Sequence, residues 1–264
     1  MQSRNPAFRS SQAFSPSPYA SFKDAPPPSA DELQRQYAAP AATGVDTGRM
    51  TMDDVVVKTG LCFAVLLPAA AVNYYLGSAA LFLLGMAGGL VLSIFISLKQ
   101  VTNPAAILTF AGLEGLFIGG LSAYFERQWP GIVAQAVLAT LAVFAVALFV
   151  YKSGRIRVTP KLARGVMIGV GAYLVFSVVN LMLASAGVGD GWGLRQGPLG
   201  FAIGLFAVGL ATLMLMLDFD FAEQGVRNGI PERYSWLAAF GLLSTLVWLY
   251  VELLRLIAIL RGDD

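Results

Sequence analysis

Seven long apolar segments constrain the fold of this chain more than any other feature. A helix needs about 20 apolar residues to cross a hydrocarbon layer about 30 Å thick. The segments are twice as long as a barrel strand and apolar on all sides, so helices that satisfy their own backbone are predicted. The sequence therefore predicts an all-α integral membrane protein, a bundle of seven transmembrane helices within 51–264. The expected spans are 57–76, 79–98, 104–125, 131–151, 165–186, 198–219 and 237–260.

Composition agrees with a chain surrounded by lipid and excludes several functions. Charged residues make up 13% of the chain, against about 25% in soluble domains. The net charge is only +2 and no basic cluster alternates with aromatic residues, which argues against nucleic acid as a partner. The chain has no His and one Cys, Cys62, which excludes His-based catalysis, His/Cys metal sites and an internal disulfide. The lipid bilayer is the expected partner, and no resident cofactor is expected.

The first 50 residues differ from the rest. They hold seven of the 13 prolines, together with many Ser, Ala and Gln residues. Such a segment buries too little apolar surface to offset its chain entropy, so residues 1–50 are predicted to be a disordered cytoplasmic tail. Order is expected to begin at Thr51, because Thr51 followed by Asp54 fits a helix capping box.

Basic residues predict the orientation in the membrane. They are concentrated in the loops at one end of the expected bundle, and the opposite loops hold only Arg127 and Arg195. Basic loops face the cytoplasm, so the N-terminus is predicted inside and the C-terminus outside a plasma membrane. The loops on the rich side contain Lys99, Lys152, Arg155, Arg157, Lys161, Arg164, Arg227 and Arg233.

Paired glycines one turn apart recur in four expected spans. Such pairs let helix backbones approach closely in lipid. Close packing within one chain is the favoured interpretation and dimerisation is the alternative, so the oligomeric state stays open. The pairs are Gly85/Gly89, Gly115/Gly119, Gly165/Gly169 and Gly200/Gly204.

Acidic residues inside the apolar segments are the candidate functional residues. Glu114 lies halfway along 104–125, Glu252 lies beyond the middle of 237–260, and Asp218 and Asp220 lie at the end of 198–219. A charge at bilayer depth costs about 2.5–3.5 kcal/mol on insertion scales, so such a residue normally faces the bundle interior and has a partner. Arg255, one turn after Glu252, could form an ion pair with it or extend outward to the membrane surface.

These four carboxyls lead to the hypothesis of a proton-sensitive cation gate. Two nearby carboxyls in a low dielectric resist ionising together, and calcium prefers carboxylate and carbonyl oxygens. Calcium could then bind at Asp218, Asp220 and Glu252. Asp218 and Asp220 are two residues apart, so at most one faces the interior. The alternative for each acid is a purely structural role. The aspartates would be hydrated residues at the end of their span, Glu252 would form a salt bridge with Arg255, and Glu114 would form a hydrogen bond inside the bundle.

Motifs in the same segments are similar to a known family. The runs Leu217–Phe221, Phe240–Ser244 and Leu249–Leu254, with the glycine-rich run Glu114–Ser122, resemble the Bax inhibitor-1/YccA (transmembrane BAX inhibitor motif) family. The resemblance covers about residues 55–262 and excludes the tail. The tail and the run that begins at Leu217 resemble an actinobacterial branch, which implies a bacterial plasma membrane.

The resemblance implies a pH-sensitive calcium leak. Bacterial members are described with an aspartate pair, one on span six and one on span seven, whose protonation opens or closes the pore. Asp218 or Asp220 matches the first position. Glu252 lies near the second, although ungapped alignment puts that aspartate at Leu249. Another bacterial member binds the protease FtsH, so the alternative function is modulation of a membrane protease or stress-response complex through the tail and loops.

One motif suggests an enzyme, but its context does not. Gly187–Asp190 matches the Gly-x-Gly-Asp pattern of intramembrane aspartyl proteases. It falls in an expected outer loop, and the chain contains no Tyr-Asp partner motif. No enzymatic activity is expected.

Overall fold

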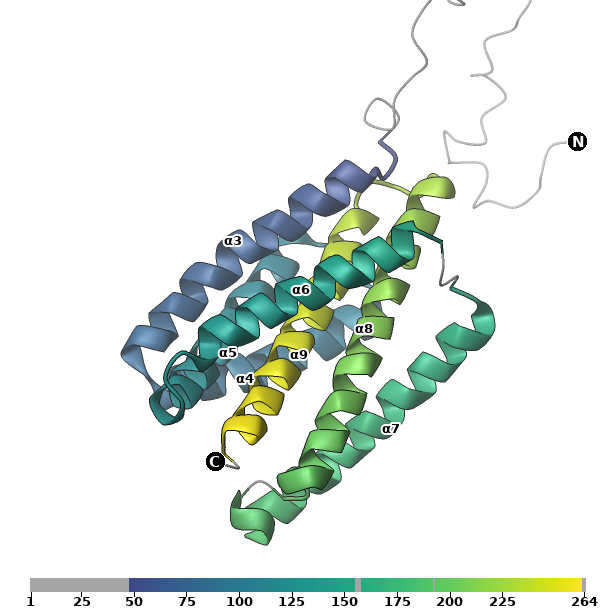
Figure 1. The fold of residues 1–264 in the computed structure, drawn as a ribbon. Coiled ribbons are helices and arrows are strands. Elements are labelled where there is room, and N and C mark those ends of the chain that lie inside the picture. The colour runs from purple at the N-terminus through teal and green to yellow at the C-terminus, as the bar shows by residue number, and fades with distance from the viewer. Residues whose placement is uncertain (1–47, 155–157, 192, 263–264) are drawn as a thin grey trace, which may run out of the picture. The chain divides into compact units, whose positions relative to one another are not determined.

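The computed structural model of the chain describes residues 48–154, 158–191 and 193–262. Within these residues, seven helices are long and apolar enough to cross a membrane (Figure 1). The predicted all-α, seven-helix fold is therefore confirmed, while the predicted tail lies, up to residue 47, outside the described residues. The helices are α3 (Met52–Leu76), α4 (Ala79–Lys99), α5 (Pro104–Gln128), α6 (Ile132–Lys152), α7 (Pro160–Ser185), α8 (Gly197–Arg227) and α9 (Tyr234–Gly262).

Local chemistry explains where the first helix begins and ends. The Thr51 hydroxyl accepts a hydrogen bond from the Asp54 backbone N–H at 3.1 Å, and the Thr51 N–H donates to the Asp54 carboxylate at 2.9 Å. This is the predicted capping box, and it satisfies two N–H groups that the first turn leaves free. The helix ends at Gly77, whose φ of 57° is left-handed and suits a residue without a Cβ.

The sixth span is longer than the sequence predicted. It continues as α8 to Arg227, well past the expected end at residue 219. Its last turns are held by polar contacts, since Tyr151 and Arg227 both donate hydrogen bonds to Glu223. Asp218 and Asp220 therefore lie within the helix and not at its end. Asp218 lies nine residues before Arg227, which is about 14 Å at 1.5 Å per residue.

The last helix is the centre of the packing. In α9, 61% of the residues in the most apolar stretch are buried, against 17% in α7. It packs against α3, α5, α6 and α8, whereas α7 packs mainly against α8 and the short 3-10 helix η2 (Val188–Gly191). Side chains on α9 are thus the ones best placed to link different helices.

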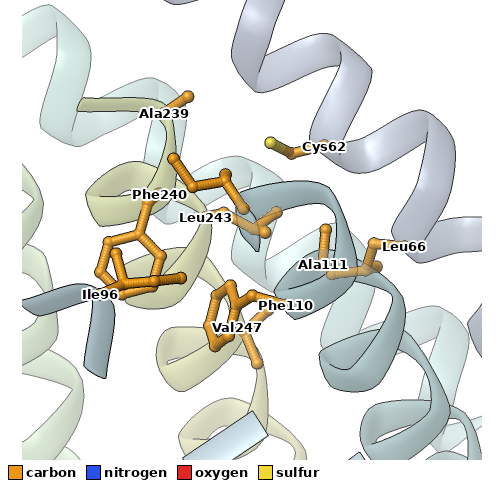
Figure 2. Packing of buried hydrophobic residues seen from close by; sticks show 10 residues of the cluster. Cys62, Leu66, Ile96, Phe110, Ala111, Ala239, Phe240, Leu243 and Val247 are labelled. Atoms are coloured by element: carbon orange, nitrogen blue, oxygen red, sulfur yellow. The ribbon is translucent and has the colours of Figure 1, made fainter. Parts of the chain in front are cut away.

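A buried apolar cluster joins the first three helices to α9 (Figure 2). The rings of Phe110 on α5 and Phe240 on α9 lie 4.8 Å apart between centroids. Cys62 and Leu66 approach from α3, and both are almost fully buried. These contacts hold α3, α5 and α9 together.

Two of the four predicted glycine pairs make close contacts between helix backbones. A Cβ at Gly85 would collide with the α5 backbone at Leu113 and Phe117, and a Cβ at Gly115 or Gly119 would collide with the α3 backbone. Packing within one chain is thereby confirmed for these two pairs. The other two pairs make no contact between helix backbones: Gly169 and Gly204 lie against leucine side chains of neighbouring helices. A Cβ at Gly165 would meet nothing within 4 Å, and Gly200 lies against the backbone of Arg195 in the preceding turn.

Candidate functional site

Glu252 is the most deeply enclosed acid among the described residues. Its exposed fraction is 3%. One carboxylate oxygen accepts hydrogen bonds from the Tyr173 hydroxyl on α7 and, at 3.2 Å, from the Trp248 indole Nε1. The other oxygen forms an ion pair with Arg255. Glu252 therefore joins α9 to α7 through Tyr173, and it has the basic partner expected from the sequence.

A second arginine completes this cluster, and sequence reasoning missed it. Arg195 stacks over the Tyr173 ring, with 5.0 Å from its guanidinium carbon to the ring centroid, and over the ring of Phe176 at 5.3 Å. Its Nη2 donates to the Ser177 hydroxyl at 2.6 Å. The only sequence signal was a lone basic residue in the loop between the fifth and sixth spans. In the tertiary structure it stacks on Tyr173, whose hydroxyl donates a hydrogen bond to Glu252.

Asp218 lies in a different place, at the interface of α8 and α9. Its Oδ2 accepts a hydrogen bond from the Thr245 hydroxyl at 2.6 Å. Gly241 lies one turn before Thr245 on α9, and a Cβ there would be 3.3 Å from Asp218 Oδ1. The absence of a side chain at Gly241 leaves room for the carboxylate. Among the described residues, this acid has a hydroxyl partner and no ion pair with a basic residue.

Asp220 points away from α9, as expected for a residue two positions from Asp218. Its carboxylate accepts a hydrogen bond from Gln224 on the same helix. It lines a cavity of about 260 Å³ between the start of α7 and α8. The structure thus decides which of the two aspartates contacts the central helix. The other residues lining this cavity are Val158, Thr159, Pro160, Ala163, Leu217, Phe221 and Gln224.

Glu114 lies apart from the other acids. It is on α5 and faces α4, where a Cβ at Gly89 would be 3.2 Å from its Oε1. In the described part of the chain it has no hydrogen bond or ion pair, so the internal hydrogen bond considered for it is not seen. The small surface of Gly89 makes room for the carboxyl between the two helices.

The structure does not bring Asp218, Asp220 and Glu252 together in the single calcium site that the calcium hypothesis considered. Thr245, the α9 partner of Asp218, precedes Glu252 by seven residues, or about 10 Å along the helix. Asp220 faces another side of α8. Over residues 48–154, 158–191 and 193–262, no three Asp, Glu or Cys side chains are close enough to share a metal ion. The acids form separate sites along the central helix.

A comparison with models of known protein families shows which family the chain belongs to. The sequence model described as Bax inhibitor 1 like matches residues 5–262. The chain belongs to this family. In this Bax inhibitor 1 like protein the family match begins in the proline-rich tail, not at residue 55 as the motifs alone suggested. A search of curated proteins found no match.

Family membership and geometry together define the candidate site. The family resemblance implied an acid on span seven facing the aspartate of span six. In this Bax inhibitor 1 like protein, the α9 group that reaches Asp218 is the hydroxyl of Thr245. The acid on α9, Glu252, is bound by Arg255 and Tyr173 instead. Thr245, Tyr173 and Arg195 are the site residues that the sequence analysis did not identify.

Proposed function

We propose that this multi-pass membrane protein is a pH-sensitive cation leak, with calcium as the transported ion and Asp218 as the gating carboxyl. The observation that supports this proposal is the environment of Asp218. It lies about 14 Å from the end of its helix, faces the central helix α9 and has the neutral Thr245 hydroxyl as its partner. Without a basic partner, the ionised carboxylate keeps its negative charge, which attracts a proton or a cation.

The contacts of Asp218 suit a site that binds calcium weakly. Calcium takes six to eight oxygen ligands. The Asp218 carboxylate and the Thr245 hydroxyl would supply only a few of them, and water would supply the rest. Conduction requires binding that is strong enough for entry and weak enough for exit. A single carboxylate with a hydroxyl fits that requirement better than a complete cage of acids.

Glu252 is proposed as a second pH-sensitive element that positions α7. When ionised, it holds the Tyr173 hydroxyl and the Arg255 guanidinium. Protonation of Glu252 would remove the charge that compensates Arg255 and weaken the link from α9 to α7. Because α7 otherwise packs mainly on α8 and η2, loss of this bond would loosen its attachment to α9, leaving the contacts of Tyr173 with Trp248 and Arg255.

Calcium flux into proteoliposomes across a pH series tests the proposal. The unmodified chain should give flux that changes with pH, and Asp218→Asn should lose most of that change. Asp220→Asn is the matched control. It removes the same charge two residues along the helix, and the Asp220 carboxylate bonds only to Gln224 on its own helix in the described residues. Equal behaviour of the two variants would contradict the assignment of Asp218. Absence of flux at every pH would contradict the leak itself and favour modulation of a membrane protease.

A further inference from the structure

A cavity of about 270 Å³ lies at the end of the bundle where α8 begins and α9 ends. Two arginines from different elements line it: Arg195, from the turn before α8, and Arg255, from α9. No acidic residue is among its described lining residues. Those residues are Trp129, Arg195, Gln196, Gly197, Arg255, Ala258, Ile259 and Gly262.

The two guanidiniums keep donors that no group in the described residues uses. All the hydrogen bonds that they donate in the described residues come from Nη2, to Ser177 in one case and to Tyr173 and Glu252 in the other. The Nε of Arg195 is buried and has no partner in that part of the chain. Each guanidinium carries five N–H donors, so several remain for a ligand.

The charges around the cavity do not balance. Glu252 compensates one guanidinium through its ion pair with Arg255, and Arg195 contributes a second positive charge. The start of α8 adds to it, because the residue before the helix, Gln196, gives no side-chain cap to its first N–H groups. Uncapped N–H groups at a helix start favour an anion. The described wall of the cavity therefore carries an excess of positive charge.

We propose that this cavity binds a phosphate group, supplied by an anionic lipid headgroup or by soluble phosphate. Arginine forks match phosphate oxygens in a bidentate manner. The cavity is smaller than the roughly 300–1,000 Å³ of typical small-molecule pockets, which suits a headgroup or an ion. Its position at the helix ends is the level of lipid headgroups in a spanning bundle. Trp129 on its wall is typical of that interface.

Binding measurements on the purified full chain distinguish the two sources. One arm follows the unfolding temperature in detergent while inorganic phosphate is added. The other arm uses native mass spectrometry to compare retention of phosphatidylglycerol and phosphatidylcholine. Stabilisation by phosphate together with selective retention of phosphatidylglycerol indicates recognition of a phosphate group with a net negative charge, because the choline of phosphatidylcholine neutralises its phosphate. Stabilisation by phosphate alone indicates a site for the soluble ion. Selective retention of phosphatidylglycerol alone indicates a lipid site. If neither arm shows binding, the proposal is wrong.

Variants locate the site independently of ion flux. Arg195→Gln should weaken binding by about 10- to 100-fold, the value of a charge-assisted hydrogen bond. Arg127→Gln is the matched control, because Arg127 is an exposed arginine at the same end of the bundle but does not line the cavity. An equal loss in both variants would show that binding depends only on general surface charge and would overturn the proposal.

Two further variants guard against misfolding and competition. Gln196→Glu adds a negative charge to the cavity wall without removing an arginine, so it should weaken binding even if Arg195→Gln fails to fold.

Asp263 and Asp264 follow the lining residue Gly262 in the sequence, and their acids could compete for the guanidiniums. Replacing both with Asn should leave binding unchanged or tighter. Loss of binding in that double variant would contradict a site built by the arginines.

Discussion

At the scale of single residues, the surroundings of two neighbouring aspartates separate their roles. Two residues along a helix correspond to about 200° of rotation at 3.6 residues per turn. Asp218 consequently meets Thr245 on α9, while Asp220 bonds Gln224 on its own helix. Identical side chains, two positions apart, thus have different chemistry available to them. Only Asp218 is placed to respond to events at the central helix.

The Thr245 hydroxyl provides a test of this assignment. A hydrogen bond donated to a carboxylate favours its ionised form. Thr245→Val keeps the shape and removes the donor, so the pH midpoint of calcium flux should move upward by roughly half to one pH unit. Thr245→Ser restores a hydroxyl and should return the midpoint close to its original value. If Val and Ser behave alike, the hydrogen bond is not what tunes Asp218.

The Glu252–Arg255 ion pair predicts a large effect on stability. Glu252→Gln leaves the Arg255 guanidinium, which is only 15% exposed, without its counter-charge. Removing one partner of a buried pair typically costs about 3–5 kcal/mol. Unfolding of the variants in detergent measures this. Glu252→Gln combined with Arg255→Gln removes both charges and should recover part of the loss. A double variant as unstable as the sum of the singles would show that the two side chains act independently.

At the scale of helices, the glycines of α5 decide how closely α3 can approach. A Cβ at Gly119 would overlap the backbone of Ala70 on α3. Gly119→Ala should therefore force the helices apart and lower the free energy of unfolding by about 1–3 kcal/mol. Gly165→Ala is the control, because a Cβ there meets nothing within 4 Å and alanine has the higher helix propensity. Equal unfolding midpoints for the two variants would contradict the close contact.

At the scale of the whole molecule, the distribution of basic loops predicts one orientation. Cys62 is fully buried, so the folded chain should not react with a membrane-impermeant maleimide until it is denatured. With Cys62 replaced by Ala, Ser185→Cys and Ser153→Cys place exposed thiols at opposite ends of the bundle. In intact bacterial cells, labelling is expected for Ser185→Cys and not for Ser153→Cys. The reverse pattern would put the N-terminus outside.

The sequence alone was enough to predict the number and type of the secondary-structure elements. An apolar run of about 20 residues has one stable form in lipid, the helix, so the seven helices and the capping box at Thr51 follow from local composition. The end of α8 could not be predicted from local composition, because its last turns depend on a contact with Tyr151, a residue far away in the sequence. Local patterns contain no information about such partners.

Only the tertiary structure decided which side chains meet. The four membrane acids were visible in the sequence because a charge in an apolar run is costly, and so was Arg255, one turn from Glu252. The partners Thr245, Tyr173 and Arg195 come from other helices or loops, and their types are common in any span or turn. Helix rotation and relative depth determine those contacts, and both depend on packing between distant segments, which no single segment of the sequence specifies.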